Sequence, residues 1–307
     1  MPRIPLSDLQ VSRLALGCNP FGWNVEKDGA FEVLDAYAAA GGNHLDTSDS
    51  YGNHGGSEEI IGAWLRERGN RDDIVVATKV ARHKDRLGLA PANIAAAADD
   101  SLRRLGTDHI DLYYAHFDDE TQTIEDMATA FDALVRAGKV RYVALSNFSP
   151  ERMREWFEFS IAEGVAPPVA LQLHYNLVER ATFENEYAPL AVEFDQSVFS
   201  YFSLASGFLT GKYRTPADAD GVDRAKGVST YLTKNGFGVV DALTQVARAH
   251  GAAPASVALA WLLVKGVTAP IASARNVEQL PDLLASTTLR LTADDVALLD
   301  RASEPFA

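Results

Sequence analysis

The chain is organised around the stretch Asn43-His44-Leu45-Asp46-Thr47-Ser48-Asp49-Ser50-Tyr51-Gly52. A short apolar run ends on Asp46, a polar turn follows, and Tyr51 comes next. From Ser57 to Arg68, apolar residues recur at helical spacing. The pattern predicts that Asp46 ends a strand and that Tyr51 lies in the loop leading to a helix. In a parallel α/β barrel, strand ends and loops of this kind form the reactive face, where a carboxylate and a phenol are candidates for proton chemistry.

The same succession of strand and helix repeats along the rest of the chain. After a hairpin at residues 1–12, eight strands are predicted, at 14–17, 43–46, 74–79, 110–116, 140–146, 170–172, 197–201 and 268–272. Helices are predicted at 31–40, 57–68, 91–105, 123–137, 150–161, 183–193, 236–250, 256–264, 277–285 and 292–300. This alternation predicts parallel pairing with helical crossovers. Eight units favour a closed α/β (β/α)8 TIM barrel capped by the hairpin, and the alternative is an open doubly wound sheet.

No linker or change of composition divides the chain, so we expect residues 1–307 to form a single domain. The one long irregular segment that we predict is Tyr213–Asn235, which follows the seventh strand. Loops of such length are often functional, and this one contains the cations Arg214, Arg224, Lys226 and Lys234. We therefore hypothesise that it closes over an anionic cofactor; an ordinary solvated loop is the alternative.

The composition excludes several classes of protein. A hydrophobic content of 47% supports a large buried core, and a net charge of −14 argues against a nucleic-acid surface. The sequence contains no run of about 18 apolar residues that could span a membrane, and residues 1–5 lack the apolar core of a secretion signal. One cysteine, Cys18, excludes an intramolecular disulfide and fits a reducing compartment. We therefore expect a cytoplasmic protein, and the oligomeric state stays open.

Four side chains occupy comparable positions in the predicted barrel. Asp46, Lys79 and His116 each end a predicted strand, and Tyr51 follows Asp46 by five residues. Strands two, three and four are neighbours in a closed barrel, so these side chains can converge. A lysine ammonium favours the phenolate of a nearby tyrosine, an aspartate holds the lysine charge in place, and a histidine can orient a carbonyl or relay a proton. Each residue alone could be structural, and it is the joint pattern that favours a reactive site.

Several motifs, in chain order, resemble the aldo-keto reductase superfamily. They are Asp46-x4-Tyr51-Gly52, Ala77-Thr78-Lys79, the run from Asp111 to His116, the run from Gly138 to Phe148, Leu171-Gln172-x-x-Tyr175-Asn176, the run from Leu204 to Tyr213, and the run from Ala274 to Leu280. The resemblance covers nearly the whole chain. It implies a (β/α)8 barrel that binds NADPH or NADH in an extended form without a Rossmann domain. Consistently, no G-x-G-x-x-G motif lies between a predicted strand and a helix.

The resemblance also implies a role for each site residue. Tyr51 would be the general acid in carbonyl reduction, Lys79 and Asp46 would tune it, and His116 would orient the substrate. Ser146, Asn147 and Gln172 would bind the nicotinamide carboxamide, with Tyr201 stacked on the ring. The residues implied for the cofactor as a whole are Asp46, Ser146, Asn147, Gln172, Tyr201, Leu204, Gly207, Leu209, Gly211, Lys212, Ser273, Arg275 and Gln279. Arg275 would pair with a 2′-phosphate, because a guanidinium binds phosphate bidentately.

We therefore predict reduction of an aldehyde or ketone to an alcohol, with hydride from the nicotinamide and a proton from Tyr51. The expected cofactor is NADPH, with NADH as the alternative, and the expected partner is a small carbonyl substrate. We assign no residue to a metal and expect no nucleic-acid or membrane partner. Two other functions stay open: an NAD-dependent sugar or alcohol dehydrogenase on the same fold, and a cofactor-sensing regulatory subunit resembling potassium-channel β subunits. Phe21, Trp23 and Phe117 could line a substrate pocket or simply pack the loops.

Overall fold

Eight parallel strands close into a barrel in the computed structural model, which describes residues 1, 3–215, 218 and 225–307. Around the barrel the strands are β3 (Ala15–Gly17), β4 (His44–Asp46), β5 (Val75–Val80), β8 (Ile110–Ala115), β9 (Val140–Ser146), β10 (Pro168–His174), β11 (Ser197–Tyr201) and β12 (Ala269–Ala272). The last strand pairs with the first, Ile271 opposite Ala15, which closes the barrel. The prediction of a TIM barrel, and not an open sheet, is therefore confirmed.

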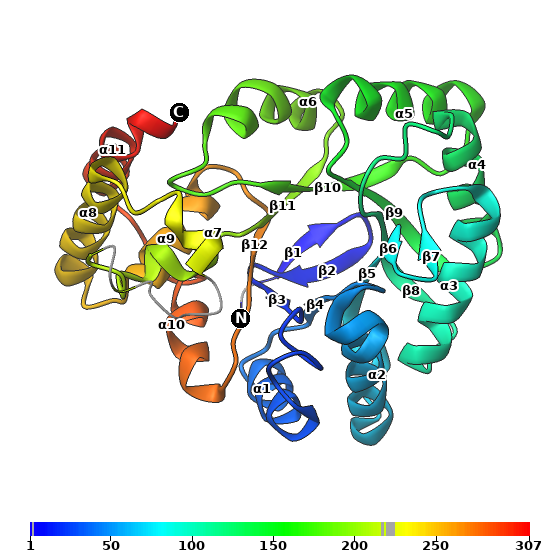
Figure 1. Cartoon of the computed structure of the whole chain (residues 1–307), viewed down its shortest axis with the longest axis horizontal. Coiled ribbons are helices and arrows are strands. Elements are labelled where there is room, and N and C mark those ends of the chain that lie inside the picture. Colours follow the sequence, from blue (N-terminus) through cyan, green and yellow to red (C-terminus); the bar gives the residue numbers. More distant parts are fainter. Residues whose placement is uncertain (2, 216–217, 219–224) are drawn as a thin grey trace.

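Helices surround the strands on the outside (Figure 1). They are α1 (Lys27–Ala39), α2 (Tyr51–Arg68), α3 (Pro91–Leu105), α4 (Ile124–Arg136), α5 (Pro150–Glu163), α6 (Ala188–Glu193), α7 (Ala225–Ser229), α8 (Lys234–His250), α9 (Pro254–Val264), α10 (Leu280–Ala285) and α11 (Ala293–Ala302). Shorter helical turns are η1 (Arg71–Asp73), η2 (Phe183–Tyr187), η3 (Ala205–Thr210), η5 (Val277–Gln279) and η6 (Glu304–Phe306). None of the helices in the described part of the chain combines the length and apolar character needed to cross a membrane.

Local sequence signals set several helix boundaries. The Thr123 hydroxyl accepts a hydrogen bond from the Asp126 N–H and caps α4, and Ser149 caps α5 in the same way just before Pro150. A side-chain oxygen at this position satisfies a backbone N–H that has no partner inside the helix. At the other end of α3, Gly106 adopts a left-handed conformation with φ of 64°, which glycine reaches without steric cost. These helices consequently begin and end close to their predicted limits.

The N-terminal hairpin seals one end of the barrel. It consists of β1 (Arg3–Leu6) and β2 (Leu9–Ser12), which pair antiparallel, and it lies among the barrel strands (Figure 1). Its buried residues Leu6, Leu9 and Val11 join the core inside the barrel, together with inward residues of the strands. The Tyr142 hydroxyl, near the start of β9, donates to Asp8 in the hairpin turn over 2.7 Å. The hairpin therefore closes the amino end of the strands and leaves the carboxyl end for the site.

The start of α2 and a small sheet after β5 are among the local features that differ from the prediction. Helix α2 begins at Tyr51, before the predicted Ser57, although Gly52 to Gly55 have non-helical dihedrals and interrupt it. A two-stranded sheet of β6 (Arg82–His83) and β7 (Arg86–Leu87) follows β5 and was not predicted.

The prediction that Tyr213–Asn235 is irregular throughout is wrong, because α7 and the start of α8 lie within it. Residues 216–217 and 219–224, including Arg224, lie outside the described residues. The hypothesis that this segment closes over a cofactor stays a prediction from sequence.

Candidate active site

The four converging residues come from three neighbouring strands. Asp46 is the last residue of β4, Lys79 is near the end of β5, and His116 directly follows β8. Tyr51 is the first residue of α2, in the loop region after β4. The ring centroids of Tyr51 and His116 lie 6.2 Å apart with the rings nearly perpendicular. The structure thus brings together the four side chains that strand order predicted to meet.

Lys79 is the buried charge at the centre of this group. Its side chain is 0% exposed, and its Nζ donates to Asp46 over 2.9 Å and to the Thr47 carbonyl over 2.7 Å. The same Nζ lies 4.9 Å from the centre of the Tyr51 ring. Burial by itself would lower the pKa of Lys79, but the charge of Asp46 and the contact with Tyr51 outweigh it and raise that pKa. Lys79 therefore keeps its positive charge beside the phenol.

Tyr51 holds its proton in this environment. Burial raises the pKa of Tyr51, and this effect exceeds the lowering by the Lys79 charge. The predicted effect of the Lys79 ammonium, which favours the phenolate, is therefore present, but burial sets the net direction of the pKa shift. The physical reason is the loss of water around the phenol, which disfavours the charged phenolate. At neutral pH the phenol is protonated and next to an ammonium that can stabilise the phenolate left after proton donation.

His116 is a neutral imidazole. Burial, followed by the charges of Lys79 and Arg82, holds the pKa of His116 well below its usual value. Its Nδ1 lies 3.3 Å from the Ser48 hydroxyl oxygen. A neutral histidine carries one N–H, and the hydrogen bond at one ring nitrogen determines what the other nitrogen can do.

The residues predicted to bind the carboxamide are linked to the same group. Gln172 Nε2 donates to Asp46 over 2.7 Å, and the Ser146 hydroxyl donates to the Gln172 carbonyl over 2.9 Å. Asn147 Nδ2 donates to the His116 carbonyl over 2.8 Å. The Gln172 amide therefore contacts Asp46 directly, and the Asn147 amide joins the same network through the Ser146 hydroxyl. Amides of this kind can both donate to and accept from a carboxamide.

Tyr201 connects this network to an aromatic surface at the end of β11. Its hydroxyl donates to Asn147 Oδ1 over 2.8 Å. Its ring stacks on His174, with centroids 5.2 Å apart and an interplanar angle of 18°. Phe202, the next residue, is 57% exposed and packs edge-on against Tyr201. Sequence reasoning missed His174, although its place as the last residue of β10 was a usable signal.

The stretch predicted to run along a pyrophosphate forms the tight turns of η3. Gly207 has φ of 92° and Gly211 has φ of 80°, conformations that favour glycine. A Cβ at Gly207 would lie 3.2 Å from Lys212 Nζ, so the absence of a side chain there lets the lysine approach the backbone. Lys212 is exposed and has no ion-pair partner among the described residues. Leu204 is partly buried and Leu209 is fully buried in the core, so Leu209 offers only its backbone to a ligand.

The residues predicted for the adenosine end lie beyond β12. The Ser273 hydroxyl donates to Asn19 Oδ1 over 2.6 Å. Arg275 is exposed, and its backbone N–H donates to Gln279 Oε1 over 2.9 Å. Arg275 precedes η5, which begins at Val277, and the Gln279 side chain closes the turn between them. The Arg275 guanidinium has no hydrogen bond or ion pair to any described residue, so it is available to an anion.

The aromatic residues predicted near the rim divide into two groups. Phe21 is fully buried and packs in the core, so for Phe21 the packing alternative is correct. Trp23 is 52% exposed. Phe117 is partly exposed, and its ring lies 4.8 Å from that of His116 and 4.4 Å from the Arg82 guanidinium carbon. Phe117 is therefore the predicted pocket residue that contacts the site.

A second buried polar group, missed from the sequence, supports α2 behind the site. Glu58 is fully buried, accepts from the Thr78 hydroxyl over 2.5 Å and pairs with Arg104 Nε over 2.6 Å. It ties α2 to β5 and α3. Nothing in the spacing of Glu58 distinguishes it from the exposed Glu59 beside it, since the difference is made by the rotation of the helix.

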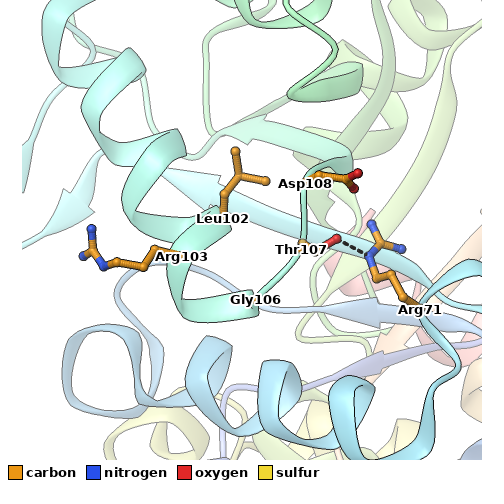
Figure 2. Close-up of a pocket in the computed structure, with 6 residues that line it drawn as sticks. All are labelled: Arg71, Leu102, Arg103, Gly106, Thr107 and Asp108. Atoms are coloured by element: carbon orange, nitrogen blue, oxygen red, sulfur yellow. Dashed lines mark hydrogen bonds between the residues drawn. The ribbon is translucent and has the colours of Figure 1, made fainter.

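A surface depression of about 670 Å³ lies before the amino ends of β5 and β8, opposite the site. Figure 2 shows the residues that line it. Its lining comes from the end of α3 (Leu102, Arg103), the connection from α3 to β8 (Gly106, Thr107, Asp108) and η1 before β5 (Arg71). The Arg71 guanidinium there is fully engaged, bonding Asp111 over 2.7 Å and Thr107 over 2.9 Å. In barrels of this type the amino end of the strands serves stability and the carboxyl end serves chemistry. We therefore assign no reaction to this depression.

The closed barrel and the Tyr–Lys–Asp–His group at its carboxyl end are those of a TIM-barrel oxidoreductase. Residues 13–304 match the sequence model of the aldo/keto reductase family. The chain therefore belongs to the aldo/keto reductase family, whose members act on the carbonyl–alcohol pair, and the resemblance noted in the sequence is confirmed.

Curated relatives agree with this assignment. Aldo-keto reductase str7 of Strobilurus tenacellus is 33% identical, over 94% of this chain and 85% of its own length. The aryl-alcohol dehydrogenase [NADP(+)] of Phanerodontia chrysosporium is 30% identical, over 96% of this chain and 82% of its own length. Aldo-keto reductase yakc [NADP(+)] of Schizosaccharomyces pombe is 33% identical, over 85% of this chain and 78% of its own length. Two of these three relatives are named for NADP(+).

Proposed function

We propose that this chain reduces an aldehyde or ketone to the alcohol, with NADPH as the hydride donor and Tyr51 as the proton donor. The observation that carries the proposal is the position of Lys79 Nζ, buried between Asp46 at 2.9 Å and the Tyr51 ring at 4.9 Å. A protonated phenol next to a fixed ammonium can deliver a proton and then be stabilised as the phenolate. Asp46 keeps the ammonium charged and in place.

The residues at the carboxyl end fit a nicotinamide cofactor. The amides of Asn147 and Gln172 suit a carboxamide, the Tyr201 ring offers a stacking surface, and Lys212 beside Gly207 offers a cation to phosphate. When bound, the cofactor would supply the hydride, which none of the side chains at the site can supply. The names of two relatives and the unpaired Arg275 both favour NADPH over NADH. The rings of Tyr51, His116 and Phe117 would then face the substrate, which supports aryl aldehydes as the first class to assay.

The test is Tyr51→Phe, assayed with a panel of aryl and alkyl aldehydes and ketones and with both cofactors. We expect kcat to fall by about 10²–10⁴-fold, because that is the usual contribution of a general acid. NADPH affinity, measured by fluorescence titration, should stay close to that of the parent, because the phenol is the group removed. Tyr142→Phe is the matched control: it removes a hydroxyl bonded to Asp8 at the far end of the barrel and should leave kcat unchanged. Retention of more than about a tenth of kcat in Tyr51→Phe would assign the proton to another group.

A further inference from the structure

Asp49 is a buried carboxyl group that the proposed reaction does not use. It lies between β4 and α2, two residues before Tyr51, and is 1% exposed. Its Oδ1 accepts from the Ser48 hydroxyl over 3.0 Å. Its Oδ2 is buried and has no hydrogen-bond partner among the described residues. A buried carboxylate oxygen without a partner is costly, so this position favours a carboxyl group that can take up a proton.

The surroundings of Asp49 act in the same direction. Burial, together with the charge of nearby Glu58, raises the pKa of Asp49 to about 7, while the Ser48 hydroxyl, the backbone N–H of His83 and the Arg104 charge oppose this shift. The titratable and charged groups that face Asp49 come from four packed elements: Tyr51 and Glu58 on α2, Arg104 on α3, His83 of β6 through its backbone, and Tyr113 on β8. Asp49 therefore changes its charge close to neutral pH.

Ser48 connects Asp49 to His116. The Ser48 oxygen lies 3.0 Å from Asp49 Oδ1, 3.3 Å from His116 Nδ1 and 3.0 Å from the Ser50 hydroxyl. A hydroxyl has one proton to donate, so Ser48 can donate to Asp49 or to His116 but not to both. The Ser48 oxygen also accepts from the Ser50 backbone N–H over 3.3 Å, which leaves one lone pair for a proton from Asp49 or from His116. The direction of the Ser48 O–H bond is therefore set by whichever neighbour is the stronger acceptor.

The two charge states of Asp49 give opposite arrangements. An ionised Asp49 accepts the Ser48 proton, so the Ser48 oxygen accepts from Nδ1–H of His116 and Nε2 is left with a lone pair. A protonated Asp49 donates to Ser48, which then donates to Nδ1, so the single imidazole proton sits on Nε2. His116 is neutral throughout, and these are its two tautomers.

We propose that Asp49, acting through Ser48, selects the tautomer of His116 and thereby decides whether Nε2 can donate a hydrogen bond to the substrate carbonyl. This inference rests on the proposed function, in which His116 faces that carbonyl. Asp49 is a positioning residue, because it acts through Ser48 and does not contact the reacting atoms. A carbonyl oxygen is polarised by an N–H donor and repelled by a lone pair, so the form with a protonated Asp49 is the one competent for reduction.

The direct test is nitrogen NMR of the full chain labelled with ¹⁵N-histidine, in which the two ring nitrogens show which one carries the proton. The His116 signals are identified by their loss in His116→Asn. With the pKa of Asp49 at about 7, we expect the proton on Nε2 about 1.5 pH units below that value and on Nδ1 about 1.5 units above it. Asp49→Asn and Ser48→Ala should each abolish this exchange with pH, so the test does not depend on one variant folding. Asp85→Asn, the same change in the exposed turn between β6 and β7, should retain it.

Kinetics provide a second readout. In the parent, kcat/KM for carbonyl reduction should fall about tenfold per pH unit above the Asp49 transition, and in Asp49→Asn this limb should be absent. The same His116 tautomer at both pH values in the parent, or an exchange that persists in Asp49→Asn, would overturn the selection of the tautomer. An exchange without the kinetic limb would overturn its link to catalysis. Because NMR requires no turnover, absence of any carbonyl reduction would defeat the proposed function separately.

Discussion

At the scale of single residues, the site depends on opposing effects of burial and charge on neighbouring groups. Burial favours the neutral form of every ionisable side chain, and so it acts against the ammonium of Lys79 and in favour of the phenol of Tyr51. Asp46 reverses the outcome for Lys79 only, because it contacts the ammonium at 2.9 Å. The result is a charged donor next to a neutral acid. Removal of the Asp46 carboxylate alone, or of the Lys79 ammonium alone, would abolish that combination.

Arg275 offers a prediction about cofactor preference. Its guanidinium is exposed and has no partner among the described residues, so a 2′-phosphate would gain a charge-assisted contact there. We expect Arg275→Ala to weaken NADPH binding about ten- to a hundredfold, corresponding to about 1.5–3 kcal/mol, with a much smaller change for NADH. Fluorescence titration with each cofactor measures both affinities. Arg66→Ala is the control, because Arg66 is an exposed arginine in the last turn of α2, away from the site. Equal losses for the two cofactors in Arg275→Ala would remove Arg275 from phosphate recognition.

At the scale of elements, the sequence predicts most of the barrel, because the hydrophobic periodicity and the residues that end helices and strands indicate the same boundaries. The limits of α3, β9 and β11 match the prediction, since proline, glycine or a change of period marks their ends. The sheet of β6 and β7 was missed because two-residue strands have no measurable periodicity. The early start of α2 was missed because Gly52 and its neighbours favour a turn. The residues with left-handed dihedrals are confined to the stretch from Gly52 to Gly55, which interrupts the helix.

Glycine at a helix contact gives a prediction about stability. A Cβ at Gly62 of α2 would lie 2.4 Å from the Arg104 carbonyl oxygen and 2.6 Å from that of Leu105, so α2 and α3 would have to separate. We expect Gly62→Ala to lower the free energy of unfolding by about 1–3 kcal/mol, the usual cost of overpacking. Gly238→Ala is the matched change in α8, where a Cβ meets nothing within 4 Å; it should stabilise by about 0.5–1 kcal/mol through helix propensity. Urea denaturation measures both, and a stabilised Gly62→Ala variant would contradict the close packing of α2 on α3.

At the scale of the whole molecule, the site is assembled from residues far apart in the chain. Asp46 and Gln172 are 126 positions apart and share a hydrogen bond of 2.7 Å. The convergence of Asp46, Lys79 and His116 could be predicted, because adjacent parallel strands end at the same edge. The contacts of Ser48 with Asp49 and His116 and the stacking of His174 on Tyr201 could not be predicted, because they depend on side-chain rotamers and burial. Strand order therefore predicts which residues meet, and the protonation chemistry follows only from the assembled structure.

The contact of Arg180 with α11 gives the last prediction. Arg180, after β10, is 6% exposed; its guanidinium bonds the Ser303 hydroxyl over 2.7 Å, the Asp300 carbonyl over 3.1 Å and the Glu184 carboxylate over 2.8 Å. These bonds attach α11 to the loop between β10 and α6. Removing one partner of a buried ion pair leaves the other charge without compensation.

We expect Arg180→Met to reduce the free energy of unfolding by about 3 kcal/mol, the lower end for buried pairs, because Glu184 is 25% exposed. Arg154→Met is the control: its partner is Glu193, and the two side chains are 41% and 50% exposed, so water screens the pair and its loss should cost about 0–1 kcal/mol. Urea unfolding of the parent and both variants, followed by fluorescence, compares the two costs. If Arg180→Met is no less stable than Arg154→Met, apolar contacts alone hold α11 in place. The hydrogen bonds of the Arg180 guanidinium would then contribute nothing to the free energy of unfolding.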